Sequence, residues 1–253
     1  MTRVVAIIQA RVGSTRLPSK VLMDIAGKPM LWHVLNRVKQ SKLINEVVLA
    51  TTKKEEDAPL LKIAEECGTK CSAGSEEDVL DRYFQAATKF DADIIVRVTA
   101  DCPLIDPEVM DKVTSHFLKG DFDYVSNNIK PTYPTGLDLE VFSYNTLKRA
   151  WEEARWASER EHVTPYMRNQ KMFKIGNVEH EKDLSGMRWT VDVKEDLEFV
   201  REVYKRLYKK GRIFLMGHVL KLLEEHPELM EINKGIARNE GYLKSLKNDR
   251  IVK

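Results

Sequence analysis

Short apolar runs rich in β-branched residues recur along the first half of the chain, and segments with the apolar spacing of helices separate them. The apolar runs occupy residues 4–8, 46–51, 93–99 and 122–127. The helical segments begin with proline or carry acidic residues early, as helices commonly do. They occupy residues 29–42, 54–66 and 76–90. Strands and helices that alternate in this way predict βαβ units and a parallel sheet.

The predicted strands are apolar with almost no alternation between apolar and polar positions. A strand has this composition when helices cover both faces of its sheet. The pattern therefore predicts an α/β fold with three layers, α/β/α, around a mostly parallel central sheet.

Beyond residue 130 the pattern is less regular. A turn-rich stretch precedes a strand-like run at 137–143, a helical region of one or two helices at 144–169 and a last predicted strand at 188–193. A further helix is predicted over 195–210, because it has apolar residues at helical spacing and ends in basic residues before a glycine.

The C-terminal part contains shorter helical pieces and then a tail, residues 239–253, without clear periodicity. No internal repeat or flexible linker divides the chain. We therefore predict one main domain over residues 1–212, with a helical extension over residues 213–253 packed on it.

The composition narrows the class of protein. Lys and Arg total 41 and Asp and Glu total 39, so the formal net charge of +2 does not predict binding to nucleic acid. No apolar stretch approaches the ~20 residues that span a bilayer. Three cysteines, Cys67, Cys71 and Cys102, do not make a disulfide framework or a metal-binding pattern. We expect a cytoplasmic protein that binds neither nucleic acid nor membrane.

One short loop is unusually basic. It follows the first predicted strand and reads QARVGSTRLPSKVL over residues 9–22. Backbone amides around Gly13, the guanidinium groups of Arg11 and Arg16 and the ammonium of Lys20 would suit a triphosphate. The loop matches neither the Walker A pattern nor Gly-x-Gly-x-x-Gly. A solvated basic turn is the alternative that this loop leaves open when it is considered alone.

Carboxylates follow two other predicted strands. Asp101 comes just after the strand at 93–99, and Asp192 lies at the end of the last predicted strand. Ligands of open α/β sheets bind beyond the carboxyl ends of the strands, and Mg²⁺ prefers one or two carboxylates with phosphate oxygens and water. The two residues therefore predict a Mg²⁺ site facing the basic loop, although either one alone also fits a helix cap.

Neighbouring acidic residues have a structural interpretation. Asp106 is predicted to cap the helix that follows Asp101, with Pro103 stiffening the turn between them. Glu195 and Asp196 are predicted to lie in the first turn of the helix after Asp192, where they complement the helix dipole.

Five motifs in order carry a family resemblance. They are QARVGSTRLPSKVL, TADCPLIDP, GLDLEVFS, SEREHVTPYM and RWTVDVKEDLEFV. Together they resemble the spore-coat polysaccharide biosynthesis type of cytidylyltransferase, related to the 3-deoxy-manno-octulosonate and acylneuraminate cytidylyltransferases, over about residues 3–205. The resemblance implies a nucleotide-diphospho-sugar transferase (Rossmann-like, GT-A type) fold, transfer of CMP from CTP to a sugar hydroxyl with release of pyrophosphate, and a homodimer.

The resemblance also implies roles for individual residues. The catalytic group would be Arg11, Lys20, Asp101 and Asp192, with Mg²⁺ held by the two aspartates. The nucleotide would be bound by Gln9, Ala10, Arg11, Gly13, Ser14, Arg16, Lys20, Ser75, Asp78, Arg82 and Asp101. The sugar, expected to be an acidic keto-sugar, would contact Asp138, Glu140, Glu161 and His162. For Ser75, Asp78 and Arg82, helix capping and a surface salt bridge are the alternatives.

The chain departs from the family pattern at two positions of the loop. Ser19 precedes Lys20 where the family commonly has glycine, and Gln9 stands where several sialic-acid relatives have proline. Neither change removes a charge from the predicted phosphate site. Both leave the sugar specificity open.

Three other functions remain possible at this point. The first is a nucleotidyltransferase that acts on a sugar 1-phosphate or uses another nucleotide. The second is a GT-A glycosyltransferase, although the metal-binding Asp-x-Asp of that class is here Asp-Cys-Pro, residues 101–103. The third is a nucleotide-binding regulatory subunit without catalytic activity.

Overall fold

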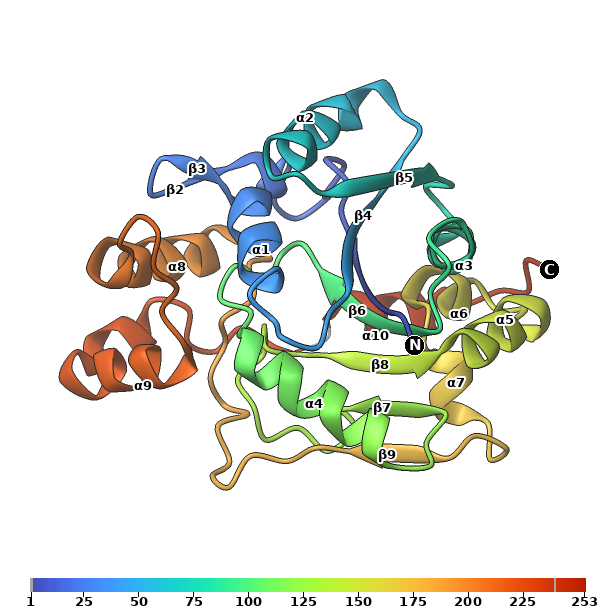
Figure 1. The fold of residues 1–253 in the computed structure, drawn as a ribbon. Helices are drawn as coiled ribbons and strands as arrows, with labels where there is room; N and C mark the ends of the chain where they lie inside the picture. The colour runs from blue at the N-terminus through green and yellow to red at the C-terminus, as the bar shows by residue number, and fades with distance from the viewer. Residues whose placement is uncertain (1, 239) are drawn as a thin grey trace.

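A computed structural model describes residues 2–238 and 240–253. Within these residues the main sheet has seven strands in the order β5-β4-β1-β6-β8-β7-β9 (Figure 1). In chain order the strands are β1 Val4–Gln9, β4 Glu46–Thr52, β5 Lys70–Gly74, β6 Ile94–Thr99, β7 Tyr124–Ser126, β8 Glu140–Ser143 and β9 Ile175–Asn177. β8 is antiparallel to both of its neighbours, whereas the other pairings are parallel. The predicted mostly parallel sheet is confirmed.

Helices cover both faces of this sheet. In chain order they are α1 Met30–Val38, α2 Ala58–Glu66, α3 Val79–Lys89, α4 Pro107–Lys119, α5 Tyr144–Glu153, α6 Ala157–His162, α7 Pro165–Asn169, α8 Lys194–Leu207, α9 Met216–Glu225 and α10 Glu240–Lys247. Three 3₁₀ turns, η1 Lys20–Leu22, η2 Glu55–Asp57 and η3 Pro227–Glu231, and a hairpin of β2 Asp24–Ile25 with β3 Lys28–Pro29 complete the described elements.

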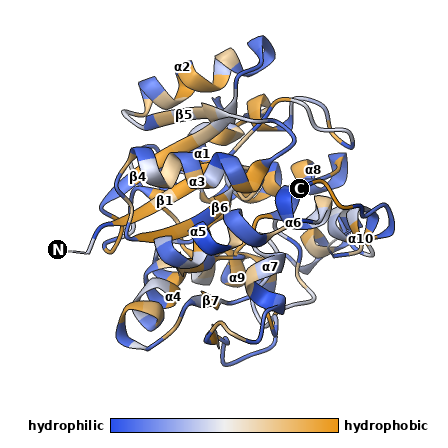
Figure 2. Cartoon of the chain, turned by 90° about the vertical axis from the view of Figure 1, so that its right-hand side faces the viewer, coloured by the Kyte–Doolittle hydropathy of each residue, from blue (hydrophilic) through white to orange (hydrophobic). Residues whose placement is uncertain are grey.

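The core consists of two apolar clusters, one on each face of the sheet. Val4, Ala6 and Ile8 of β1 pack with α1, α2, α4, α8 and α9. Val5 and Ile7 of the same strand pack with α3, α5 and α7. Both faces of β1 are therefore buried, which explains its apolar sequence and confirms the three layers. Figure 2 shows the hydrophobic colour concentrated on the central strands.

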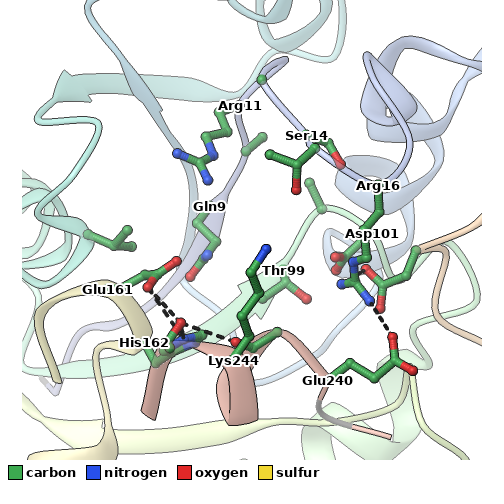
Figure 3. A pocket seen from close by; sticks show the side chains of 18 of the residues that line it. Gln9, Arg11, Ser14, Arg16, Thr99, Asp101, Glu161, His162, Glu240 and Lys244 are labelled. Carbon is green, nitrogen blue, oxygen red and sulfur yellow. Dashed lines mark hydrogen bonds and ion pairs between the residues drawn. The ribbon is translucent and has the colours of Figure 1, made fainter. Parts of the chain in front are cut away.

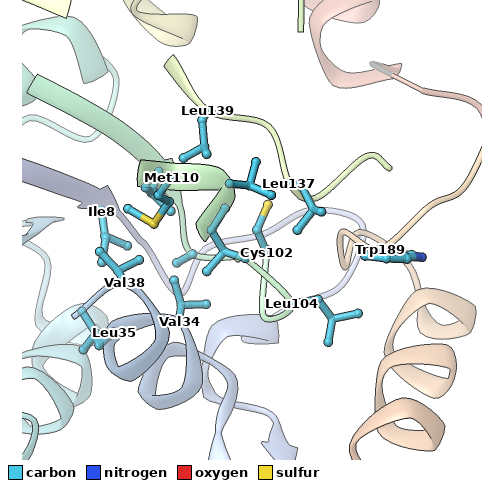
Figure 4. Packing of buried hydrophobic residues seen from close by; sticks show 14 of the residues in the cluster. Ile8, Val34, Leu35, Val38, Cys102, Leu104, Met110, Leu137, Leu139 and Trp189 are labelled. Carbon is cyan, nitrogen blue, oxygen red and sulfur yellow. The ribbon is translucent and has the colours of Figure 1, made fainter. Parts of the chain in front are cut away.

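The larger cluster extends beneath the carboxyl ends of the strands. There Ile8 and Leu139 of the central region meet Val34 of α1 and Met110 of α4, and Cys102 lies among them (Figure 4). Burial raises the pKa of the Cys102 thiol well above its usual range. Cys102 is therefore a packing residue, and its burial anchors the turn that includes the preceding residue, Asp101.

The prediction of a strand at 188–193 is wrong. This segment forms a single bridge, Arg188 with Thr135, and then hydrogen-bonds to a loop: the Val191 amide donates to the Asp101 carbonyl at 2.8 Å. Its partner turn contains Gly136 at φ +107°, where an added Cβ would lie 2.5 Å from the Thr190 nitrogen. The segment is buried and apolar like a strand, but it pairs with turns rather than with the sheet.

Several other elements differ from the predictions. The region 144–169 forms three helices, α5 to α7, instead of one or two. The short strands β5 and β9 and the β2–β3 hairpin are absent from the predictions, because two to five partly polar residues give no usable period. Asp106 caps α4 as predicted, since its side chain accepts from the amides of Glu108 and Val109.

The C-terminal part has two distinct environments. Phe214, Val219, Leu222 and Leu229 are buried in the larger cluster. By contrast, α10 has no buried residue and contacts α6.

Asn239, at the start of the tail predicted to lack periodicity, lies outside the described residues. A domain boundary at residue 212 stays a prediction. In residues 2–238 and 240–253, none of the helices has the length and apolar character to cross a membrane.

Candidate active site

The basic loop is held in a fixed shape by its own backbone and by one buried carboxylate. The Val12 amide donates to Asp57 Oδ1 at 2.6 Å, and Asp57 is buried. The Val12 carbonyl accepts from the amides of Ser14, at 2.8 Å, and Ser19, at 3.1 Å. Ser19 takes the left-handed conformation, φ 56°, in which the loop turns into η1. The glycine that the family commonly has here suits this backbone, because it adopts positive φ without steric cost.

Lys20 lies between the two predicted metal ligands. Its Nζ donates to Asp101 Oδ2 at 2.7 Å and to Asp192 Oδ1 at 2.9 Å, and also to the Val191 carbonyl at 2.8 Å. Burial acts to lower the pKa of Lys20, but the two carboxylates outweigh it and the pKa is raised. Burial acts to raise the pKa of Asp101, but Lys20 outweighs it and lowers that pKa to about 2. At neutral pH the ammonium and Asp101 are both charged.

Asp192 is oriented by a second ion pair behind it. Arg188 donates to Asp192 Oδ2 at 3.0 Å and to both carboxylate oxygens of Asp196, which is fully buried. Asp196 also accepts from the amides of Asp192 and Val193, in the first turn of α8 where the sequence predicts it. Arg188 is therefore a positioning residue that the sequence reasoning missed, because a single arginine in a predicted strand gives no signal.

These groups open into a pocket of about 830 Å³ at the carboxyl ends of β1 and β6 (Figure 3). Arg16 forms an ion pair with Asp192 Oδ1 at 2.8 Å and lies 3.7 Å from Glu240, and Arg11 lies 3.5 Å from Glu76. The predicted site residues that line the pocket are Gln9, Ala10, Arg11, Gly13, Ser14, Arg16, Lys20, Arg82, Asp101, Glu161, His162 and Asp192.

Two lining residues carry polar atoms without a partner. Gln9 Oε1 and Arg82 Nε are buried and make no hydrogen bond to the described residues. Another nitrogen of Arg82, Nη1, donates to the Ser75 carbonyl at 3.2 Å, and burial lowers the pKa of this guanidinium. Unpartnered polar atoms in a pocket are costly unless a ligand or water bonds to them.

Four predicted site residues lie outside the lining of this pocket. Asp78 caps α3 and pairs with Arg160 at 2.5 Å, while the Ser75 hydroxyl accepts from the Asp78 amide. Asp138 pairs with Arg238 at 2.6 Å, and Glu140 pairs with Arg97 and accepts from Tyr124 and Thr164. In the structure each of the four makes a polar contact within the fold.

The remaining wall comes from α6 and from the C-terminal helix α10. Glu161 Oε2 accepts from the Ser245 hydroxyl at 2.8 Å, and His162 Nε2 lies 2.9 Å from the same hydroxyl. Burial lowers the pKa of His162 despite the neighbouring Glu161, so the ring is neutral at pH 7. The sequence reasoning missed α10, whose residues Glu240, Gly241, Lys244 and Ser245 line the pocket.

The residues predicted to hold Mg²⁺ fit that ion in their chemistry. Two carboxylate oxygens, one from Asp101 and one from Asp192, converge within 3 Å of a single point, the Lys20 Nζ. The described residues contain no group of three or more His, Cys, Asp or Glu side chains placed to hold a metal. A pair of carboxylates is the usual protein share of a Mg²⁺ site that nucleotide phosphates complete.

The fold and this pocket define an α/β protein with an open pocket at the carboxyl ends of the parallel strands β1 and β6. The model of the family described as cytidylyltransferase matches residues 5–225, and the chain belongs to that family of nucleotidyltransferases. The resemblance drawn from the five motifs is confirmed.

Individual relatives agree with the family assignment. The chain is 32% identical to the spore coat polysaccharide biosynthesis protein SpsF of Bacillus subtilis, over 90% of this chain and 97% of the relative. It is 38% identical to the 3-deoxy-manno-octulosonate cytidylyltransferase of Trichlorobacter lovleyi, over 46% of this chain and 45% of the relative. The solved structure of a cytidylyltransferase from Leptospira borgpetersenii superposes with a TM-score of 0.88 at 33% identity, covering 94% of this chain and all of that one.

Proposed function

We propose that this protein transfers CMP from CTP to a hydroxyl group of a sugar, with release of pyrophosphate, and that the acceptor is an acidic keto-sugar. One observation carries the proposal: Lys20 joins Asp101 and Asp192 in a pocket whose loop also presents Arg16. The names of the relatives support the sugar, since one is named for coat polysaccharide biosynthesis and another for 3-deoxy-manno-octulosonate.

The chemistry needs little covalent participation from the protein. The acceptor hydroxyl gives up its proton to solvent water and its oxygen forms a bond to the α-phosphorus of CTP. The bond from that phosphorus to the β-phosphate bridging oxygen breaks, and pyrophosphate leaves with its electron pair. Catalysis then depends on alignment and on positive charge where negative charge accumulates. Arg11, Arg16 and Lys20 are the loop cations proposed to bind the β- and γ-phosphates.

The loop cations already pair with carboxylates, so binding of the triphosphate would replace these ion pairs with ion pairs to phosphate oxygens. Arg16 would exchange contacts with Asp192 and Glu240 for phosphate oxygens, and Lys20 would exchange at least one of its two carboxylates. The released carboxylates of Asp101 and Asp192 are the groups proposed to hold Mg²⁺. When bound, that ion would supply positive charge to the phosphates and lower the pKa of the acceptor hydroxyl.

Pyrophosphate release tests this proposal. The purified protein with Mg²⁺ is offered CTP, UTP, GTP and ATP, each with acidic eight- and nine-carbon keto-sugars and with sugar 1-phosphates. We expect release with CTP and an acidic keto-sugar and no release without acceptor. Release only with sugar 1-phosphates, or with none of the acceptors, would contradict the proposal. Asp101→Asn is the inactive control for contaminating activity.

The expected homodimer also stays a prediction. The region between residues 130 and 180, where the resemblance implies self-association, contains the exposed apolar side chains Met172 and Ile175, the second of them in the edge strand β9. Light scattering of the purified protein at several concentrations tests it. A mass of one chain, about 29 kDa, would contradict it.

A further inference from the structure

The pocket has a second wall that the predicted site does not include. Six of its lining residues lie in the last 14 residues of the chain: Glu240, Gly241, Lys244, Ser245, Asn248 and Arg250. Figure 3 shows Lys244 projecting from α10 beside Glu161 and His162 toward the strand ends that carry Gln9 and Thr99. The C-terminal helix therefore faces the basic loop across the pocket.

Contacts on both sides of Lys244 fix the position of this helix. Ser245, the next residue, bonds to Glu161 and lies 2.9 Å from His162, and the Tyr242 ring packs edge-on against His162 at 5.0 Å. Beyond α10, Asp249 accepts from the Ser158 amide and hydroxyl, at 2.9 and 2.6 Å. The helix is attached to α6 through polar contacts although none of its residues is buried.

The cations on the two walls differ in their partners. On the loop wall, Arg11, Arg16 and Lys20 each lie within 4 Å of at least one carboxylate. The Lys244 ammonium has no hydrogen bond or ion pair to any residue in 2–238 or 240–253. An ammonium that lines a pocket without a partner can bind an anionic group without first breaking an ion pair.

We propose that Lys244 binds the carboxylate of the sugar acceptor and so selects acidic sugars. This inference rests on the proposed function. The triphosphate has three cations of its own on the loop wall, whereas Lys244 belongs to the wall of Glu161, His162 and Ser245. These neighbours offer a carboxylate, an imidazole and a hydroxyl, which are the groups that bind sugar hydroxyls. An acidic sugar on this wall would place its carboxylate on Lys244 and its hydroxyls on the neighbours.

Steady-state kinetics with an acid and its neutral analogue test the proposal. Lys244→Gln is compared with the unmodified protein, using 3-deoxy-manno-octulosonate and its primary amide as acceptors. A lost charge-assisted hydrogen bond corresponds to about a tenfold change in affinity. We expect KM for the acid to rise about tenfold in the variant, KM for the amide to stay the same and KM for CTP to change less than twofold. Lys244→Arg should restore most of the preference for the acid.

A matched control lies on the same helix. Lys247 is exposed and does not line the pocket, so Lys247→Gln should leave both KM values unchanged. An increase in KM for CTP rather than for the acid in Lys244→Gln would assign the ammonium to the nucleotide and overturn the proposal. Equal loss for acid and amide, or no change, would also overturn it. If the unmodified protein transfers CMP to no acidic acceptor, the proposed function itself fails, and that result is visible without any variant.

Discussion

The two walls of the pocket are built in different ways. The loop wall follows buried strands, and its charges are held by ion pairs such as that of Lys20 with Asp101 and Asp192. The C-terminal wall is a short helix with no buried residue, attached by polar contacts, and its Lys244 ammonium is unpaired within the part of the chain that the structure describes. We propose that the first wall positions the reacting phosphates and that the second recognises the acceptor.

Substitution of a carboxylate in the loop wall is expected to have the largest effect, a loss of turnover. Asp101→Asn removes a carboxylate charge but keeps the shape, so turnover should fall by roughly 10²–10³-fold, as when one charged group that stabilises a transition state is lost. Pyrophosphate release measures it. The matched control is Asp121→Asn, because Asp121 is exposed and pairs with Lys174. Turnover within twofold of the unmodified protein would refute a catalytic role for Asp101.

A smaller effect is expected on nucleotide binding. Lys20→Met removes an ammonium that we place on the phosphates of CTP, and CTP affinity should fall about tenfold, the usual scale for a charge-assisted contact. Calorimetric titration with CTP and Mg²⁺ measures it. Lys28→Met, at an exposed lysine of the β2–β3 hairpin, is the control. Unchanged CTP affinity would show that the loop does not bind the triphosphate and would remove the distinction between the two walls.

The same variant should change stability in acid. In the folded protein the Asp101 pKa is lowered from 3.8 to about 2, so its ion pair stabilises fully above pH 3.8 and this stabilisation is lost as the pH falls toward 2. Without the Lys20 ammonium, burial is the largest remaining influence on Asp101, and it acts to raise the pKa of this carboxyl. Thermal melts between pH 2 and 7 should therefore show that Lys20→Met loses stability at a higher pH than the unmodified protein. Parallel curves would contradict the coupling.

The smallest effect is expected on the free energy of unfolding, from a substitution at Ser19. This residue has φ 56°, a conformation that costs a residue with a side chain about 1 kcal/mol relative to glycine. Glycine also loses more entropy on folding, so Ser19→Gly should raise the free energy of unfolding by only about 0.5 kcal/mol. Urea denaturation measures it, and Ala26→Gly, at φ 51° in the β2–β3 hairpin, gives the comparison away from the pocket. A loss of stability would mean that the Ser19 side chain supports the loop.

The difference between the walls also explains what the sequence could predict. Buried strands give long apolar runs, and the residues that follow them meet at one sheet edge, so Arg16, Lys20, Asp101 and Asp192 could be brought together from sequence alone. The family resemblance added Glu161 and His162, which also line the pocket. Helix α10 gave no signal, because eight residues are too few for a reliable helical period and none of them is buried.

Other misses have a similar physical origin. Asp57 acts through a long-range hydrogen bond to the Val12 amide, and its local sequence does not indicate that partner. Arg188 bonds to Asp192 and Asp196, four and eight residues further along, but a segment predicted as an extended strand does not indicate these contacts. The segment 188–193 has the composition of a strand, but the amides of Trp189 and Val191 bond to turns, and those of Asp192 and Val193 bond to the Asp196 carboxylate. Burial is readable from sequence, whereas the choice of hydrogen-bond partner depends on the whole fold.

A crystal structure with CTP and Mn²⁺ tests the central claim most directly, because the anomalous signal of Mn²⁺ locates the metal. The account predicts the triphosphate on the loop of Arg11, Arg16 and Lys20, with the anomalous peak at Asp101 and Asp192 and with α10 free to meet the acceptor. A triphosphate bound against Lys244 and Arg250, or no metal at the two aspartates when CTP is bound, would contradict it.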